Sequence, residues 1–483
     1  MWRTVFPAGQ AVELRALDTP ALMIDTSACM SLPLRSMIPL ALLVLAACGA
    51  EEPLRPGVPP RHLVLVTVEG MRADHSSAYL YGRRTTSFEI DAGGLERGRA
   101  LTPDHLAQAG VLFRHASAPS GQVELSLGAL LAGARPLEVD YRDDVRRFTL
   151  AERFAQKGFH CAAFVSQSNG PTAPANRRGF RSFEEGENDL AALGSAVSFM
   201  AEHDWGNQQG VFLWLHLSGP IYPFEPPTFP QNYHGDQPVD YAALFADPAY
   251  AGSMQVPLPT REELRARTDL LPADVEHLEA LYDGELAHTS YLIWLTLDLL
   301  RYFSETEDAM ADALLCVAGV NGMQLDPARP GFASADSSDD AALGVPLLLH
   351  HPASLTGRRV LESQVTLEDL PRTFADWFDL EGREDLRGRS LLALMDREPR
   401  ESFEERASCS YDIASVEVSA RGPVWRLTVP LRDLGEVGAP MPSSARFEPV
   451  MGLRRLPVDP DGSAALGLLE ELRAWALSQR EWR

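Results

Sequence analysis

The stretch LVLVTVEGMRADH (residues 63–75) decides the fold class of this 483-residue chain. Its first six residues are apolar or β-branched on both faces, which is typical of a central parallel strand covered by helices. Four similar runs follow, separated by amphipathic stretches: CAAFVS (161–166), VFLWLHL (211–217), ALLCVAG (313–319) and VPLLLH (345–350). This alternation predicts an α/β fold with a doubly wound, mostly parallel sheet flanked by helices.

Helical patterns fill the intervals between these runs. TLAERFAQKGF (149–159) predicts a helix that ends at Gly158, and residues 273–303 predict the longest helix. Along the longest helix, apolar residues at steps of three, four or seven mark one buried stripe. They are Val275, Leu278, Tyr282, Leu286, Ile293, Leu297 and Leu300. The Pro-rich segment 221–259 is expected to form a long surface loop over the top of the sheet.

The pattern changes after about residue 398. SVEVSARGPVWRLTVPL (415–431) predicts an antiparallel hairpin, and GSAALGLLEELRAWALSQ (462–479) predicts a helix docked beside it. We therefore expect an α/β domain over residues 61–398 and a smaller C-terminal α+β subdomain over residues 399–483.

The segment LRSMIPLALLVLAACGAEEP (34–53) resembles a bacterial lipoprotein signal. An Arg, an apolar run over 37–47, a small pair and Cys48 occur in the required order, and the run is too short to span a bilayer. We expect residues 1–48 to be a mis-assigned start, with Met30 or Met37 as the true start, plus a signal peptide. Lipidation at Cys48 and a Pro-rich linker over 49–60 would then anchor the protein in the bacterial cell envelope, on the periplasmic side or the outer surface. The alternative is that the run forms a buried apolar strand.

The net charge and the spacing of the cysteines limit which kinds of partner and of metal site are expected. A formal net charge of −24 disfavours nucleic acid as a partner, because the long-range field of the protein would repel phosphates. The expected attachment is to the membrane through Cys48, and the ligand or protein partner is unknown. No C-x-x-C spacing occurs, and Cys161 and Cys316 lie inside apolar runs, where they are expected to be small buried hydrophobes.

An ordered set of motifs resembles the sulfatase family of the alkaline-phosphatase superfamily, from about Arg61 to Leu392. The first is LVLVTVEGMRADH, which is similar to the family's first strand and metal-binding turn. The others, in order, are LTPDHLAQAGVLFRHASAPS (101–120), LLAGARP (130–136), FLWLHLSGPIYPFEPP (212–227), LYDGELAHT (281–289), GVPLLLHHP (344–352), VTLEDLPRTFADWF (365–378) and GRSLL (388–392). The resemblance implies the alkaline-phosphatase-like fold.

The resemblance also implies that the nucleophile is missing. Family enzymes carry a Cys or Ser, converted to formylglycine, in a Cys-x-Pro-Ser-Arg motif at a helix start. In QVELSLGALLAG (122–133), aligned on its Leu-Leu-Ala-Gly end, Val123 takes the nucleophile position, Leu125 the Pro and Leu127 the Arg, whereas Ser126 is kept. A valine side chain cannot become an aldehyde by that route or form a sulfate ester.

The metal ligands and the anion-binding residues of the family are also mostly replaced. A calcium ion needs about six to eight oxygen ligands. The first ligand pair of the family corresponds here to Glu69-Gly70, and the late pair corresponds to Val320-Asn321, followed by Gly322. In the histidine loop only His216 remains. The other positions of that group hold Gly219, Ile221 and Val139.

The remaining polar residues have structural or chemical interpretations. Arg72, Asp74 and His75 are expected to brace the adjoining helix. Glu69 is expected to be a partly solvated acid at a strand end, and the alternative is a general base. His216 is expected to be a hydrogen-bonded loop histidine rather than a ligand. Four further expectations concern the acids and hydroxyls: Asp283 and Glu285 cap or pair across helices, Ser120 and Ser126 are the only nearby hydroxyls, and Asp336, Asp339 and Asp340 lie in a solvated loop.

These observations lead to two hypotheses of different classes. The first is a catalytically degenerate, sulfatase-like binding or scaffolding lipoprotein without a cofactor, in which Val123, Ser126 and His216 are remnants of a catalytic site and Glu69 and Asn321 are remnants of a metal site. The second is an active sulfuric-ester or phosphoric-ester hydrolase with a rearranged site around Glu69, Asn321 and Ser126, which would use calcium.

Overall fold

The computed structural model describes residues 60–480, apart from 88–100, 138–147, 168–172, 207–208, 230–238, 305–308, 330, 336, 356, 396–405, 413–414 and 451–461. The expected signal segment with Cys48, most of the 49–60 linker, Val139 and Asp336 lie outside the described residues. The domain boundary at residues 398 and 399 also falls there and stays a prediction.

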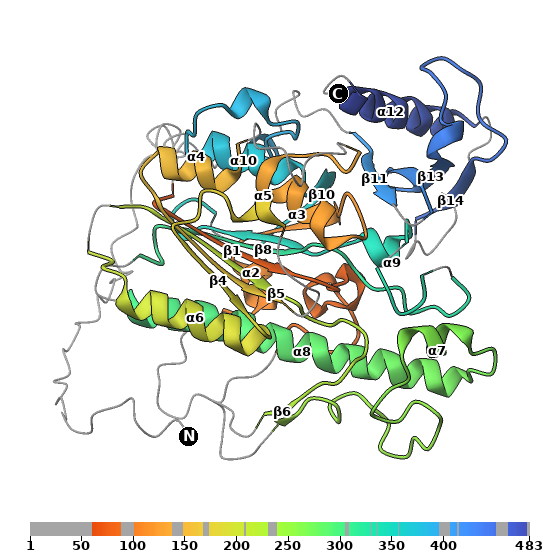
Figure 1. Cartoon of the computed structure of the whole chain (residues 1–483), viewed down its shortest axis with the longest axis horizontal. Coiled ribbons are helices and arrows are strands. Elements are labelled where there is room, and N and C mark those ends of the chain that lie inside the picture. The colour runs from red at the N-terminus through yellow and green to blue at the C-terminus, as the bar shows by residue number, and fades with distance from the viewer. Residues whose placement is uncertain are drawn as a thin grey trace, which may run out of the picture. The chain divides into compact units, whose positions relative to one another are not determined.

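A mixed, mostly parallel eight-stranded sheet forms the centre of the described chain (Figure 1). Its strands in spatial order are β10 (Arg359–Thr366), β2 (Val111–Ser117), β9 (Leu347–His350), β8 (Ala313–Gly319), β1 (His62–Val68), β5 (Val211–Leu217), β3 (His160–Ser166) and β4 (Ser182–Gly186). The predicted α/β class is confirmed. One difference is β9, which runs antiparallel to both β2 and β8 although its apolar run resembles those of the parallel strands.

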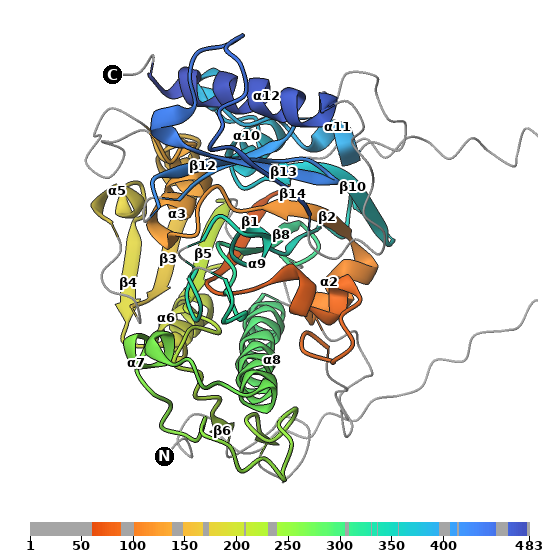
Figure 2. The same cartoon turned by 90° about the vertical axis from the view of Figure 1, so that its right-hand side faces the viewer.

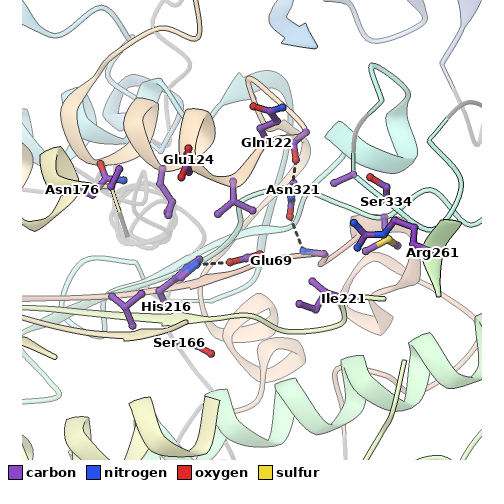
Figure 3. Close-up of a pocket in the computed structure, with 18 residues that line it drawn as sticks. Glu69, Gln122, Glu124, Ser166, Asn176, His216, Ile221, Arg261, Asn321 and Ser334 are labelled. Carbon is purple, nitrogen blue, oxygen red and sulfur yellow. Dashed lines mark hydrogen bonds and ion pairs between the residues drawn. The ribbon is translucent and has the colours of Figure 1, made fainter. Parts of the chain in front are cut away.

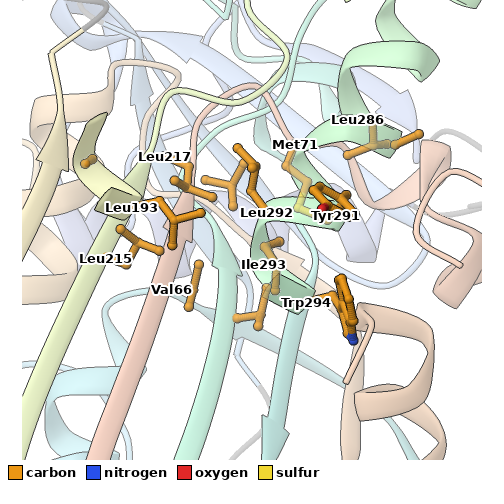
Figure 4. Packing of buried hydrophobic residues seen from close by; sticks show 14 of the residues in the cluster. Val66, Met71, Leu193, Leu215, Leu217, Leu286, Tyr291, Leu292, Ile293 and Trp294 are labelled. Carbon is orange, nitrogen blue, oxygen red and sulfur yellow. The ribbon is translucent and has the colours of Figure 1, made fainter. Parts of the chain in front are cut away.

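Two layers of helices cover the sheet, and the side chains of β1 alternate between them. Val64, Val66 and Val68 point to the face covered by α2 (Pro103–Ala109), α6 (Asp189–Glu202) and α8 (Pro272–Phe303). Leu63 and Leu65 point to the face covered by α3 (Val123–Ala132), α4 (Leu150–Gln156) and α10 (Asp369–Trp377). Both faces of the strand are therefore buried, and five of its seven residues are apolar (Figures 1 and 4).

Helix α8 matches the predicted longest helix. Of its predicted stripe, only Val275 is not fully buried, and Ile293 packs with Val66 and Leu215 of the sheet (Figure 4). Four short helices complete this part of the chain: α5 (Pro174–Arg177), α7 (Arg261–Ala266), α9 (Asp340–Leu343) and α11 (Leu392–Met395). Among the described residues, no helix is long and apolar enough to cross a membrane.

The segment 221–259 differs from its prediction as a surface loop. It contains the short strands β6 (Thr228–Phe229) and β7 (Val239–Asp240), which pair antiparallel. Tyr222, Phe224 and Met254 are buried in the core beside α8. The segment is therefore anchored by its own apolar side chains, which proline content does not reveal.

The C-terminal part forms a four-stranded antiparallel sheet with a helix packed on it. Its strands are β11 (Ser408–Asp412), β12 (Glu417–Arg421), β13 (Trp425–Pro430) and β14 (Arg446–Pro449), and the helix is α12 (Ser463–Arg480). The predicted hairpin corresponds to β12 and β13, and α12 buries Leu469 and Leu472 against them. The predicted smaller α+β unit is confirmed in these elements.

Two arginines of this small sheet bind the acidic run near residue 340. Arg421 Nε donates to Asp340 Oδ1 at 2.7 Å, and Arg426 Nη2 donates to Asp339 Oδ1 at 3.1 Å. Asp340 and Arg426 are buried, so the expectation of a solvated loop was wrong for Asp339 and Asp340. The partners of these two carboxylates, Arg421 and Arg426, lie more than 80 residues later in the chain.

Candidate functional site

The carboxyl ends of β1, β5 and β8 open into a cavity of about 340 Å³ below the first turn of α3 (Figure 3). Glu69 follows β1, His216 lies in β5, and Asn321 follows β8 by two residues. Val123, the first residue of α3, also lines the cavity. In open α/β sheets, ligands bind at this edge. Four residues singled out in the sequence therefore meet in one place.

A chain of hydrogen bonds fixes the orientation of the His216 imidazole. Parity places Thr67 and Glu69 of one strand on the same face as Trp214 and His216 of the next, and Thr67 is in register with His216. The Trp214 indole N–H donates to Thr67 Oγ1 at 2.9 Å. His216 Nδ1 lies 2.8 Å from the same Thr67 Oγ1, and His216 Nε2 lies 2.9 Å from Glu69 Oε1. The imidazole is thereby held at both of its nitrogens, with a carboxylate on one side.

This geometry corrects two expectations. Glu69 is 3% exposed and paired, so it is not a partly solvated acid. His216 is 2% exposed and belongs to β5 rather than to a loop, although both of its nitrogens are hydrogen-bonded as expected. The signal for the pair was present in the sequence, because adjacent parallel strands end with these two side chains. The sequence does not show that β1 and β5 are neighbours in the sheet, and the contact between the two side chains depends on that pairing.

Asn321 uses both ends of its side-chain amide to join two pieces of backbone. Its Oδ1 accepts the Gly70 N–H at 2.7 Å, and its Nδ2 donates to the Gly121 carbonyl at 2.7 Å. The side chain is 4% exposed. Asn321 thus ties the end of β1 to the loop before α3, and a metal ion would have to compete with the backbone for its oxygen.

Gly70 and Gly219 let two loops approach closely beside the cavity. Gly70 has φ +68°, and a Cβ there would lie 2.2 Å from the Pro220 carbonyl oxygen. Gly219 has φ +58°, and a Cβ there would lie 2.5 Å from the Glu69 carbonyl oxygen. Only glycine adopts these conformations without strain. Gly70 stands where the resemblance places the second metal ligand after the first strand, and that position has no room for a side chain.

The hydroxyl and thiol groups near the cavity are committed or buried. Ser126 is fully buried and donates to the Ser120 carbonyl at 2.7 Å, and it does not line the cavity. Ser120 Oγ accepts the Gln122 N–H at 3.1 Å. Cys161 and Cys316 are buried in β3 and β8, as expected, and burial raises the pKa of Cys161 to about 12.

The motif residues 72–75 form a dense network on the opposite face, toward α8. Arg72 binds the Asp74 carboxylate through Nε and Nη2, at 2.9 and 2.8 Å, and donates through Nη1 to the Met323 carbonyl. His75 Nδ1 lies 2.9 Å from Oδ1 of Asp283 on α8. The turn is therefore braced against the helix, as expected from the sequence.

Asp283 is the centre of that network and is fully buried. Its Oδ2 accepts from Tyr81 OH at 2.9 Å and from Arg83 Nη1 at 2.6 Å. The preceding residue of α8, Tyr282, donates through its OH to the Gly70 carbonyl at 2.7 Å and accepts the Arg72 N–H at 3.0 Å. Asp283 thus pairs across elements, as expected.

Glu285 also binds across elements, to the loop that continues from Gly219. Its Oε1 accepts the Glu225 N–H at 2.8 Å. Burial, together with the nearby carboxylates of Asp189 and Glu225, raises the pKa of Glu285 to about 8. Asp189 itself accepts the N–H groups of Ser218 and Gly219. The loop beside the cavity is therefore held from the α6 and α8 side.

Several lining residues were not found by sequence reasoning. The most important is Arg261, the first residue of α7, which the capping box of Thr260 and Glu263 fixes in place. The others are Gln122, Glu124, Ser166, Asn176 and Ser334. Gln122 and Glu124 flank Val123 and could have been inferred from that position. No sequence signal marks Arg261, which lies in α7, two residues after the segment 221–259 that was expected to be a surface loop.

The donor set does not fit a tightly bound divalent cation. Within the part of the chain that the structure describes, no group of three or more His, Cys, Asp or Glu side chains lies close enough to hold a metal ion. Glu69 is paired with His216, Asn321 Oδ1 accepts a backbone N–H, and Gly70 offers no side chain. Calcium needs more oxygen ligands than this.

Comparisons with known proteins place the fold. No protein-family model matches the sequence. No curated protein matches it either. Among solved structures, a 2-O GAG sulfatase matches with a TM-score of 0.60 at 14% identity, covering 88% of this chain and 94% of that one. The phosphonate monoester hydrolase of Agrobacterium radiobacter matches with a TM-score of 0.57 at 16% identity, covering 88% and 96%.

A second phosphonate monoester hydrolase, from Silicibacter pomeroyi, matches with a TM-score of 0.59 at 17% identity, covering 87% of this chain and 95% of that one. The likeness extends over nearly the whole length of each protein. At these identities it establishes the architecture alone. The chain therefore has the alkaline-phosphatase-like fold that sulfatases and phosphonate monoester hydrolases share.

Proposed function

We propose that this protein is a catalytically silent binding or scaffolding member of the sulfatase-like fold. The observation that carries the proposal is Gly70, because a Cβ at this position would lie 2.2 Å from the Pro220 carbonyl oxygen. The backbone occupies the space that a second metal ligand would need. The change is thus built into two loops and is more than the loss of one side chain.

The other remnants of the site support the same proposal. An oxygen of the Glu69 carboxylate is hydrogen-bonded to His216, and the side-chain oxygen of Asn321 accepts the Gly70 N–H. Val123 presents hydrocarbon at the start of α3, where the fold's sulfatases carry their nucleophile. Removing charged ligands from such a cavity lowers the cost of leaving polar groups without partners. Glu69, His216 and Asn321 hold the cavity walls together instead.

A turnover assay on the full-length chain tests the proposal. The purified protein is incubated with aryl sulfates, aryl phosphates and aryl phosphonates, with and without added calcium. We expect no hydrolysis above a heat-denatured control. We also expect none from Val123→Cys, because that variant still lacks the Arg replaced by Leu127 and a metal site. Hydrolysis by the wild type would overturn the proposal, and hydrolysis by Val123→Cys alone would show that the nucleophile register is misplaced.

One observation favours a second candidate, a hydrolase with a rearranged site. The Glu69–His216 pair is a buried carboxylate and imidazole that line one cavity, and such a pair can take a proton from water. Ser126, the hydroxyl that this alternative would use, lies outside the cavity with its hydrogen bonded to Ser120. The candidate predicts a wild-type activity that Glu69→Ala abolishes without unfolding the protein.

We further propose that a lipid on Cys48 anchors the protein in the bacterial cell envelope. The support is the ordered Arg, apolar run, small pair and Cys over residues 34–48. Membrane fractionation of cells that express the wild type or Cys48→Ser tests this. We expect the wild type in the membrane fraction and the variant in the soluble fraction; an unchanged distribution would rule out the lipid.

A further inference from the structure

The small C-terminal sheet has one apolar face and one polar face. Val418 and Leu427 lie on the face that packs against α12. Side chains alternate along a strand, so the opposite face carries Arg421 and Arg426, and it contacts the loop that leads into α9 (Figure 2). Glu448 of β14 accepts from Arg426 at 3.0 Å and orients it from within the sheet. A polar interface between two units permits relative motion more readily than an apolar one. The contacts that dock the small sheet are therefore distinct from those that hold it together.

A relay of hydrogen bonds leads from Arg426 to the wall of the cavity. Arg426 Nη2 donates to Oδ1 of Asp339 at 3.1 Å, and Gln324 Nε2 donates to Oδ2 of the same carboxylate at 3.0 Å. Gln324 Oε1 accepts the Asp326 N–H at 2.9 Å, which fixes the orientation of the amide. The Gln324 backbone N–H donates to the Ser334 carbonyl at 2.8 Å, and Ser334 lines the cavity. One carboxylate thus joins the small sheet to the cavity wall.

A second contact of the small sheet ends on the loop before α3. The Tyr411 N–H of β11 donates to the Pro119 carbonyl at 2.8 Å. Two residues after Pro119, Gly121 lines the cavity and packs against the wall that the relay reaches, because a Cβ on Gly121 would lie 1.8 Å from the Ala335 carbonyl oxygen. The small sheet therefore holds both backbone segments that meet at this side of the cavity.

We propose that the small sheet is a latch on the cavity, with Arg426 and Asp339 as its positioning residues. When the latch is closed, the wall at Ser334 and Ala335 stays against Gly121. When it opens, that wall moves away and the cavity widens. This inference rests on the proposed binding function and concerns its regulation. A ligand that fits one of the two states better shifts the docking of the small sheet, and docking changes the affinity by the same factor.

Hydrogen exchange of the full-length protein, read by mass spectrometry, tests the latch without a ligand. In Arg426→Gln we expect the amides of 323–329 and 331–335 to exchange about tenfold faster, because the wall opens locally once the relay is broken. The amides of β1 and α12 should keep the protection of the wild type.

Asp339→Asn is a gentler variant for the same measurement. Asparagine keeps the size of the side chain and one acceptor for Arg426, but it presents an NH₂ group to Gln324 instead of an oxygen. We expect the same pattern of faster exchange to a smaller degree. Arg432→Gln is the matched control, because Arg432 follows β13 by two residues and its side chain is 86% exposed. Its exchange should equal that of the wild type.

A cysteine at the cavity wall reports on access to the cavity. Val123→Cys is alkylated with iodoacetamide, and the rate at position 123 alone is followed by peptide mass spectrometry. We expect Arg426→Gln to raise this rate several-fold in the Val123→Cys background, and Arg432→Gln to leave it unchanged.

Two outcomes would overturn the inference. One is unchanged exchange at the cavity wall and unchanged alkylation in Arg426→Gln and Asp339→Asn. The other is an equal loss of protection at β1, which would make Arg426 a residue of general stability. Neither measurement needs a ligand, so both are separate from the ester assay. Hydrolysis there would refute the proposed function and leave the latch standing, whereas an inert latch would leave catalytic silence standing.

Discussion

The two sides of the end of β1 differ in how closely they match the sulfatase motifs that the sequence resembles. Toward α8, residues 72–75 match the turn of that motif, and its ionisable side chains have partners: Arg72 with Asp74, and His75 with Asp283. Toward α3, the cavity has hydrocarbon or glycine where the resemblance places a nucleophile and a metal ligand. The two regions are a few residues apart in sequence and begin at the same strand.

The difference indicates which residues the fold requires. The turn side supports the strand, because Tyr282 and Asp283 of α8 bind the backbone of residues 70–72 and the side chain of His75. On the cavity side, Glu69, His216 and Asn321 each hydrogen-bond to another part of the protein. If this is correct, substitutions on the turn side should cost stability, and substitutions at cavity positions should affect stability only where a brace is broken.

The largest effect is expected from Asp283→Ala. The substitution removes the buried carboxylate that is hydrogen-bonded to His75, Tyr81 and Arg83. Breaking a buried charge pair costs about 3–5 kcal/mol. The free energy of unfolding from urea titration measures this cost. The control is Asp298→Ala on the same helix, where the more exposed pair with Arg301 should cost about 1 kcal/mol or less. Equal effects of the two variants would contradict the role of Asp283.

A smaller loss is expected from Gly70→Asp, which introduces the acidic residue type that the resemblance to sulfatases places at this position. The positive φ and the Pro220 carbonyl make the side chain cost about 3 kcal/mol through backbone strain and overpacking. Gly82→Asp is the matched control, because nothing lies within 4 Å of a Cβ there. A stable Gly70→Asp variant that binds calcium would show that the two loops can open.

Asn321→Ala should cost about 2 kcal/mol, because the Gly70 N–H and the Gly121 carbonyl lose their partner in a buried place. Thermal or urea unfolding measures it. Gln255→Ala removes an exposed amide that donates to the Gly252 carbonyl and should change stability little. If Asn321→Ala leaves the stability unchanged, water replaces the two hydrogen bonds of the side chain, and Asn321 does not brace the backbone.

The smallest effect concerns the pH dependence that Glu285 contributes. Its pKa is about 8 in the folded protein and lies in the ordinary carboxyl range when unfolded. Between these values the folded state binds more protons, so rising pH lowers the free energy of unfolding. Glu285→Gln should remove this slope between pH 6.5 and 8, a window above the titration of His288, whose pKa burial lowers to about 4. Glu276→Gln, exposed on the same helix, should keep the slope; its loss there would assign the effect to general charge.

Much of the fold could be predicted from the sequence, because hydrophobic runs and helical periodicity report burial directly. The central strands and α8 were found within one or two residues, and so was the β12–β13 hairpin. The reversed direction of β9 could not be predicted, since a run buried on both faces looks the same in either direction.

The site was only partly predictable. Motif positions identified Glu69, Val123, His216 and Asn321, and all four line one cavity. Their hydrogen bonds depend on which strands are neighbours and on backbone groups without a sequence signature. The same holds for Asp339 and Asp340, whose partners Arg421 and Arg426 lie far along the chain, and for Arg261, which enters from a segment of irregular composition.

The account's central claim is that the polar residues of the cavity brace the backbone and do not hold a metal ion. Its most direct test is thermal unfolding of the full-length wild type and of Glu69→Ala, each with a chelator and with millimolar calcium. A bound ion raises the midpoint in proportion to the logarithm of its concentration over Kd. We predict the same midpoint for the wild type under both conditions, and a lower midpoint for Glu69→Ala that is equally insensitive to calcium. A wild-type midpoint that falls with chelator and rises with calcium, and a Glu69→Ala midpoint that does neither, would contradict the claim.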